Sequence, residues 1–161
     1  MTATAHTTAP ALNPRVIGLA HYAGRALLEA VLARHGATFQ QSVTLRAIAT
    51  AAEPIALDEL VAQVDASLKV GEPAVREVVE EMADAKLMET QASRVVLTDA
   101  GHELYERTTA ETAPISAKLY AGIPAEDLAV AGRVLTLITQ RANAELAGAG
   151  TGADADADAD A

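Results

Sequence analysis

Small side chains dominate this sequence and limit the kind of core that it can build. Of its 161 residues, 38 are alanine and only four are aromatic, namely Tyr22, Phe39, Tyr105 and Tyr120. The core must therefore be aliphatic, and alanine is the strongest helix former. The sequence has no cysteine, so no disulfide can stabilise it. We expect a mainly α-helical chain, long enough for one domain of ordinary size.

Helical periodicity and chain-breaking residues predict six helices and one small β-hairpin. Apolar residues recur at intervals of three and four, and the breaks fall at Gly36, Pro54 and Gly71-Glu72-Pro73. The expected helices cover residues 14–35, 38–52, 58–68 and 73–86, with one that starts at Thr98 and a last one that starts at Pro124. Two β-biased runs, 87–90 and 94–97, are separated by Gln91-Ala92-Ser93.

The two ends of the chain lack an apolar face. We expect residues 1–13 to form a disordered arm and residues 148–161, with their Ala-Asp repeat, to form an acidic low-complexity tail. The start carries no basic residue and no apolar run, so it is not a secretory signal. No eighteen uncharged apolar residues follow one another, from which we predict no membrane-spanning helix and a cytoplasmic protein.

The predicted order of helix, helix, turn, helix and hairpin is that of a winged helix-turn-helix domain. Several short segments, in this order and spacing, resemble the MarR family of bacterial transcriptional regulators. They are Gly36-Ala37-Thr38-Phe39-Gln40-Gln41 with Leu45, Ile55-Ala56-Leu57-Asp58-Glu59-Leu60, Leu87-Met88, Leu97-Thr98-Asp99-Ala100-Gly101, and Ala121-Gly122-Ile123-Pro124-Ala125-Glu126-Asp127-Leu128. The resemblance covers nearly all of residues 19–146.

The resemblance implies a winged helix-turn-helix flanked by N- and C-terminal dimerisation helices. Within a domain of residues 14–147, the DNA-binding lobe would cover about residues 40–97, and residues 14–35 and 98–147 would hold a homodimer. Such a protein binds a pseudo-palindromic double-stranded operator, and we predict that it represses. The apolar stripes of residues 16–30 and 128–138 support dimerisation independently, because one small chain cannot fully cover them.

The predicted helix 73–86 would be the recognition helix. By the resemblance, Arg76 occupies the position that reads base edges, where a guanidinium can form a bidentate contact to guanine. The DNA-binding residues that we predict are Lys69, Pro73, Ala74, Arg76, Glu77, Ser93 and Arg94, with Arg94 contacting the phosphate backbone. The alternative for Arg76 is a solvated side chain paired with Glu72 and Glu80 at i±4 spacing.

The charge distribution opposes DNA binding. The chain carries a net charge of −10 at pH 7, and residues 53–97 hold ten acidic against four basic residues. Five acidic residues, Glu72, Glu77, Glu80, Glu81 and Asp84, lie on the predicted recognition helix, and acids near phosphates reduce affinity. The alternative function is therefore a winged-helix protein that has lost DNA binding and acts through protein–protein contacts.

In the family, the first helix and the start of the second border a pocket for an aromatic or phenolic effector. The corresponding residues here are His21, Tyr22, Arg25, Phe39, Ser42 and Arg46. Arginine beside tyrosine or histidine suits a small phenolic or carboxylate ligand. The alternative is that Tyr22 and Phe39 belong to the core and that the arginines are solvated.

Nothing in the sequence favours catalysis or a cofactor. No nucleophile elbow, phosphate-binding loop or zinc-protease motif is present. His102 and Glu106, one helical turn apart, could share a metal ion, but no further histidine lies near them in sequence and an ordinary surface pair is the simpler interpretation. We predict no enzyme, no metal site and no cofactor.

Overall fold

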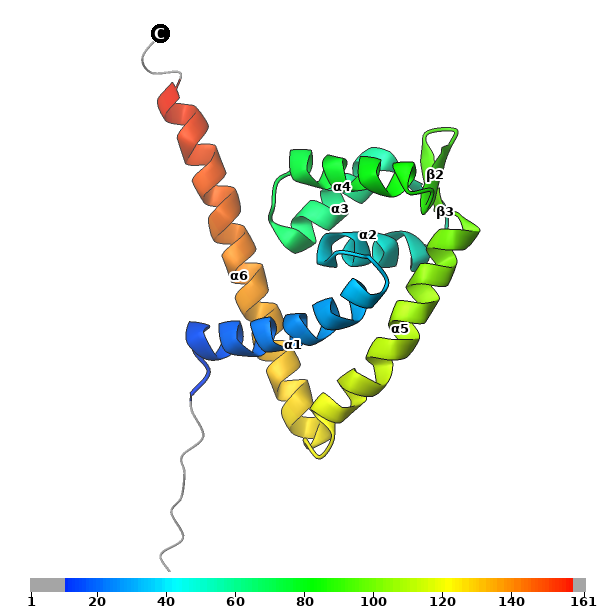
Figure 1. Cartoon of the computed structure of the whole chain (residues 1–161). Helices are drawn as coiled ribbons and strands as arrows, with labels where there is room; N and C mark the ends of the chain where they lie inside the picture. The colour runs from blue at the N-terminus through cyan, green and yellow to red at the C-terminus, as the bar shows by residue number, and fades with distance from the viewer. Residues whose placement is uncertain (1–10, 158–161) are drawn as a thin grey trace, which may run out of the picture. The chain divides into compact units, whose positions relative to one another are not determined.

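The computed structural model describes residues 11–157 (Figure 1). Its contacts divide the chain into two compact units, Met1–Ala117 and Lys118–Ala161, where the length predicted a single domain. The elements are α1 (Pro14–Arg34), α2 (Phe39–Ala49), β1 (Ile55–Ala56), α3 (Leu57–Leu68), α4 (Glu72–Asp84), β2 (Met88–Gln91), β3 (Arg94–Leu97), α5 (Asp99–Tyr120) and α6 (Ala125–Ala157). The mainly helical class and the small β-hairpin that the sequence predicted are confirmed.

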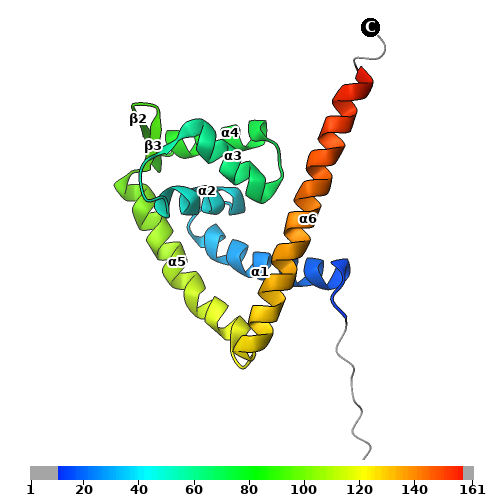
Figure 2. The same ribbon diagram turned by 180° about the vertical axis from the view of Figure 1, so that it is seen from behind.

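The core of the first unit is aliphatic, as the composition predicted. It lies among α2, α3, α4 and the sheet, which are seen from two sides in Figure 1 and Figure 2. Its most deeply buried side chains are Leu45, Leu60, Val61, Val64, Val75, Met82 and Val95, each no more than 1% exposed. None of the four aromatic side chains is fully buried. They remain available for a surface or a cavity.

The sheet has three strands in the order β1-β3-β2, one more than the predicted hairpin. Strand β3 pairs antiparallel with β2 through Met88–Leu97 and Gln91–Arg94, and with β1 through Ile55–Val95. β1 has only two residues, too short to show a period of two in the sequence. The hairpin turns at Ala92 and Ser93, which both have positive φ, the conformation that a two-residue hairpin loop requires.

A three-residue turn joins α3 to α4. Lys69 ends α3 in the left-handed conformation, and the backbone N–H of Gly71 donates to Asp65 Oδ1 at 2.7 Å. Gly71 has φ +90, which favours glycine. The helix predicted for residues 73–86 starts one residue earlier and ends at Asp84, since Lys86 itself adopts positive φ.

Helix α1 is anchored at both ends. Asn13 caps its start by accepting a hydrogen bond from the N–H of Val16 at 3.1 Å, and Val31 and Leu32 near its end are 1% exposed.

Among residues 11–157, α1 is also the one helix that is long and apolar enough, by length and composition, to cross a membrane. The prediction that no segment has this composition was therefore too strong, because it required a run free of charge. The buried end and its packing on α2 identify α1 as a helix of the first unit.

The second unit contains the last helix, α6. In the stretch 125–149 none of its side chains is buried, and Val130, Val134, Leu135, Leu137, Ile138 and Leu146 are exposed. The helix continues to Ala157, which corrects the prediction of an unstructured tail for residues 148–157. Extending an existing helix needs no new nucleus, and the tail is rich in alanine. Residues 1–10 of the predicted arm and 158–161 of the tail lie outside the described residues.

Candidate nucleic-acid interface and effector pocket

Helix α4 has one buried and one exposed face, as a recognition helix requires. Val75, Val78, Val79 and Met82 face the core. Of the predicted DNA-binding residues on this helix, Pro73, Arg76 and Glu77 are exposed and Ala74 is half-buried. Glu72, Glu80, Glu81 and Asp84 are exposed as well. The solvent-facing surface of α4 is therefore acidic, with Arg76 as its one basic residue.

Arg76 is already paired. Its Nη2 donates to Asp58 Oδ1 at 2.9 Å and lies 3.7 Å from Glu72 Oε2. The hydrogen bond that Arg76 donates to Asp58 is the main reason that the pKa of Arg76 is raised above its usual value. The predicted pair with Glu72 is confirmed, whereas in the described part of the chain Glu80 makes no ion pair. Asp58 was missed because it lies on α3, in the first turn, and no periodicity of α4 points to it.

The remaining predicted DNA-binding residues are Lys69, which precedes α4, and Ser93 and Arg94, which belong to the β2–β3 hairpin. Lys69 is exposed in the α3–α4 turn, and Ser93 is exposed at the tip of the hairpin. Arg94 is exposed, but its Nη1 donates to the backbone carbonyl of Pro54 at 2.6 Å, which ties its side chain to the segment before β1. The α3–α4 turn thus supplies Lys69 and strand β3 supplies Arg94 as the predicted DNA-binding cations outside α4.

A cavity of about 490 Å³ lies between α1, α2 and α5, within the first unit. Its lining residues are Leu28 and Leu32 from α1, Phe39, Ser42, Val43, Arg46 and Thr50 from α2 and its C-cap, and Tyr105, Thr108, Thr109 and Thr112 from α5. Three of the six residues predicted for an effector pocket, Phe39, Ser42 and Arg46, line this cavity. Its volume is in the range of small-molecule sites.

The other three predicted pocket residues lie outside the cavity lining. Arg25 stands behind it, with its guanidinium carbon 4.4 Å from the centre of the Phe39 ring and its Nε bonded to Glu29 Oε1 at 2.8 Å. His21 and Tyr22 contact each other edge to face, with ring centres 5.3 Å apart, and Tyr22 is 68% exposed. These two residues lie almost two helical turns along α1 from Leu28, the first residue of this helix that lines the cavity.

Helix α5 supplies a wall of the cavity that was not predicted from the sequence. Tyr105, Thr108, Thr109 and Thr112 fall on one side of this helix at spacings of three and four. Threonines at that spacing interrupt an otherwise apolar stripe with polar groups. This interruption was the available sign in the sequence that the helix face lines a cavity. What the sequence could not provide is the position of α5 opposite α2, because the two helices are at least fifty residues apart along the chain.

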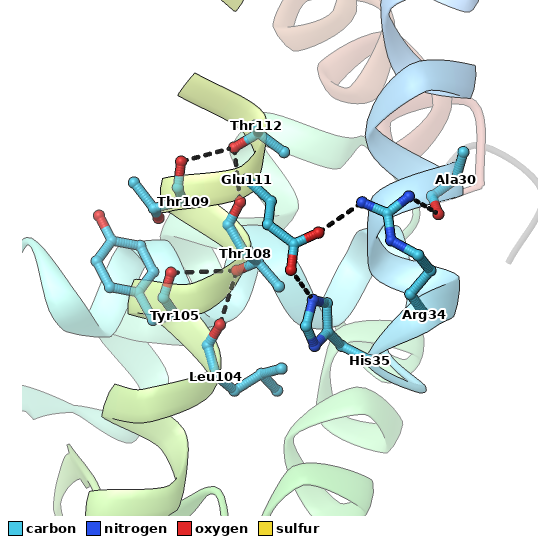
Figure 3. A network of polar contacts seen from close by, with 9 residues as sticks. All are labelled: Ala30, Arg34, His35, Leu104, Tyr105, Thr108, Thr109, Glu111 and Thr112. Carbon is cyan, nitrogen blue, oxygen red and sulfur yellow. Dashed lines mark hydrogen bonds and ion pairs between the residues drawn. The ribbon is translucent and has the colours of Figure 1, made fainter. Parts of the chain in front are cut away.

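A carboxylate on α5 joins this wall to α1 (Figure 3). Glu111 accepts from Arg34 Nη2 at 2.5 Å and contacts His35 Nε2 at 2.8 Å. The hydrogen bond from Arg34, followed by that from His35, holds the pKa of Glu111 below its usual value. These are the ion pairs that connect α1 with α5 in the described residues. Glu111 thus fixes the distance between two of the three walls of the cavity.

His102 and Glu106 lie one turn apart on α5. No group of three or more histidine or acidic side chains in residues 11–157 is arranged to hold a metal ion. His102 instead lines a second, smaller cavity of about 190 Å³, with Glu53 and Pro54 and with residues of β3. That cavity lies beside the sheet rather than between α1, α2 and α5.

No family model matches the sequence, and no curated protein matches it significantly. Solved structures match over most of the chain. MarR from Staphylococcus aureus, solved with salicylate and kanamycin, is 20% identical, with a TM-score of 0.70 over 81% of this chain and 90% of that one. The Mycobacterium tuberculosis MarR family protein Rv2887, in complex with DNA, is 20% identical, with a TM-score of 0.61 over 80% and 98%.

A third similar structure is CouR from Rhodococcus jostii RHA1 bound to p-coumaroyl-CoA. It is 15% identical, with a TM-score of 0.65 over 77% of this chain and 88% of that one. At these identities the likeness concerns the fold. It agrees with the element order of the first unit, in which α3, α4 and the β2–β3 hairpin form a helix-turn-helix with a wing. The chain has the winged-helix fold of MarR-type transcriptional regulators.

Proposed function

We propose that this protein is a ligand-responsive, DNA-binding transcriptional regulator that works as a homodimer in the cytoplasm and represses its target. The observation that carries the proposal is the position of the cavity against α2. One side of this helix lines the cavity through Phe39, Ser42 and Arg46. Its other side packs Leu45 and Ile48 into the core shared with α3 and α4. A ligand in the cavity therefore contacts the helix on which the helix-turn-helix rests.

The cavity suits a small phenolic or carboxylate effector. Arg46 makes no ion pair with any described residue, so its guanidinium is available to an anionic group. Phe39 and Tyr105, two of the four aromatic residues, supply flat apolar surface. The salicylate bound to the Staphylococcus aureus protein has this chemistry, and so does the aromatic acyl group of the ligand of CouR.

The proposal is tested with the DNA upstream of the protein's own gene, in gel shifts at two salt concentrations. Arg76→Gln should lower affinity for the preferred operator roughly tenfold or more and relax preference at one base position. Arg94→Ala should weaken binding to all sequences alike and flatten the salt dependence by about one unit.

Glu77→Gln should tighten nonspecific binding, because it removes a negative charge near the phosphates. A probe that fills the cavity should release the DNA.

The acidic surface of α4 supports a second candidate function. Arg76 is paired with Asp58 and Glu72, so its charge is largely compensated before any DNA approaches. A winged-helix protein in this state would act through protein–protein contacts instead. If the wild-type protein binds no DNA even at low salt, and neither Glu77→Gln nor Glu80→Gln restores binding, this second function replaces the first.

A further inference from the structure

Two carboxylates from different helices hold the guanidinium of Arg76. Asp58, in the first turn of α3, accepts a hydrogen bond from Nη2 at 2.9 Å, and Glu72 Oε2, at the start of α4, lies 3.7 Å from the same nitrogen. The second distance is too long for a hydrogen bond, so Glu72 acts through its charge. We call these three residues the Arg76 cluster. With one cation and two anions, the cluster is negative overall.

Both helices that carry the Arg76 cluster pack on the same core. The buried side chains of α3 are Leu60, Val61 and Val64, and those of α4 are Val75, Val78, Val79 and Met82. The bond between Asp65 and the N–H of Gly71 closes the turn between the two helices. Asp58 therefore has a fixed place beside Arg76, and it orients a long side chain that would otherwise be mobile.

The pairing leaves one edge of the guanidinium available. The N–H groups of a guanidinium form a planar fork, in which neighbouring nitrogens can donate side by side. Within residues 11–157, Arg76 makes a single hydrogen bond, from Nη2 to Asp58. The second proton of Nη2 can therefore donate together with a proton of the adjacent nitrogen. The side chain of Arg76 is 44% exposed, so this edge is open to a partner.

The charge of the Arg76 cluster decides which acceptor uses this edge. A phosphate is anionic, so the carboxylates of Asp58 and Glu72 repel it, and a swing of Arg76 towards the DNA backbone would break the bond to Asp58. The major-groove edge of guanine is neutral and presents O6 and N7 side by side. Guanine can pair with the free edge while the bond to Asp58 stays intact. The cluster thus favours a base edge over the backbone.

We infer that Asp58, assisted by the charge of Glu72, sets the DNA selectivity of α4 by reserving Arg76 for guanine and withholding it from phosphates. This inference rests on the proposed function, since it concerns the same DNA-binding surface. It makes Asp58 a positioning residue, which acts on DNA only through Arg76. The pairing of Arg76 then lowers nonspecific affinity and raises the preference for the correct sequence.

The experiment measures the affinity of the full-length protein for two duplexes. One is selected by the wild type from a random-sequence pool, and the other is a shuffled duplex of the same length and composition. Asp58→Ala removes the partner of Arg76. Glu59→Ala is the matched control, because Glu59 is exposed in the same turn of α3 and makes no ion pair with a described residue. Thermal melting checks that each variant is folded.

The two variants should differ in selectivity. Relative to Glu59→Ala, Asp58→Ala should bind the shuffled duplex about two- to fivefold more tightly, the range expected for release of an exposed ion pair. It should bind the selected duplex no more tightly than the control does. The salt dependence of binding to the shuffled duplex should steepen by about one unit in Asp58→Ala alone, because Arg76 then joins the phosphate contacts.

Modified bases identify the group that Arg76 contacts. Guanines of the selected duplex are replaced one at a time by 7-deazaguanine, which lacks the N7 acceptor. At one position of the half-site this change should weaken wild-type binding by about fivefold or more. The loss should be smaller in Asp58→Ala, where Arg76 is no longer oriented, and absent in Arg76→Gln.

Double variants show whether Asp58 acts through Arg76. In the Arg76→Gln background, Asp58→Ala and Glu59→Ala should have equal effects on both duplexes. The inference is overturned if they differ there, or if they act alike when Arg76 is present. It is also overturned if no guanine responds to the loss of N7, or if the wild type prefers no sequence.

The fate of the proposed function is read separately, with salicylate as the probe of the cavity. If salicylate releases the selected duplex but Asp58→Ala and Glu59→Ala act alike, the regulator proposal stands and the role of Asp58 fails. If the preference for guanine depends on Asp58 but salicylate leaves the DNA bound, the proposed ligand response fails and the role of Asp58 stands.

Discussion

Gly101 lies at a point in the first unit where the packing leaves no room for a side chain. A Cβ at this position would lie 2.0 Å from the backbone oxygen of Leu87, in the segment between α4 and β2. Gly101→Ala should therefore lower the free energy of unfolding by about 1–3 kcal/mol, as overpacking does in rigid surroundings. Urea denaturation measures this change. Gly24→Ala on α1, where nothing lies within 4 Å of the new Cβ, is the control and should be neutral or stabilising.

Arg76 is the residue whose role depends most on one neighbour. Asp58→Asn removes the negative charge of the carboxylate to which its guanidinium donates, so Arg76 is held less tightly, with Glu72 as its remaining ion-pair partner, and is more available to DNA. We expect tighter DNA binding in a gel shift at fixed salt. Glu59→Gln is the matched control, because it removes the same charge from the same first turn of α3 without touching Arg76. Equal gains from the two variants would mean that general charge, and not the release of Arg76, limits binding.

At the scale of elements, the join between α1 and α5 depends on pH. The pKa of Glu111 in the folded protein is lowered by the hydrogen bond from Arg34 and then by that from His35. The carboxylate therefore contributes its full stabilisation at pH values above 4.5, the usual pKa. This stabilisation is lost as the pH falls through the lower pKa that Glu111 has in the folded protein. Wild type should be more stable than Glu111→Gln near neutral pH, and the difference should shrink below 4.5.

The measurement is urea denaturation of both proteins between about pH 7 and pH 3. Glu106→Gln, also on α5, is the control, since Glu106 makes no ion pair within the described residues. Its difference from wild type should stay nearly constant over the same range. A constant difference for Glu111→Gln as well would contradict a role for the contacts of Glu111 with Arg34 and His35.

At the scale of the whole molecule, the exposed apolar side chains of the terminal helices predict a homodimer. Leu19 and Leu27 on α1 and Val134, Leu135 and Ile138 on α6 are 38–62% exposed. Exposed apolar residues in such numbers on each of these helices are typical of interaction surfaces. Sedimentation at micromolar concentration should give about twice the monomer mass. Leu135→Glu should shift the protein towards monomer, whereas Ala83→Glu, which adds the same charge on α4, should not.

Local order in this molecule follows from the sequence. The helix boundaries agree within a few residues for α1 to α4, and Thr38 caps α2 through a capping box with Gln41. The periodicity that predicts these helices is carried by residues that are neighbours along the chain, so no knowledge of distant contacts is needed. The prediction failed at β1, whose two residues are too few to show a periodicity. It also failed at the end of α6, where the expectation of disorder rested on composition alone.

The sequence alone therefore determined the helical class, the aliphatic core and the order of elements typical of a winged helix. Only the tertiary structure decided what the functional side chains meet. Asp58, the partner of Arg76, lies on α3, 18 residues earlier in the chain. Glu111 pairs with Arg34, from which it is separated by 77 positions in the sequence. Likewise the threonines of α5 line a cavity only because α5 lies opposite α2. Periodicity fixes the face of a helix on which a residue lies, but the group that faces it depends on how distant helices pack, and a single sequence does not encode that in any local pattern.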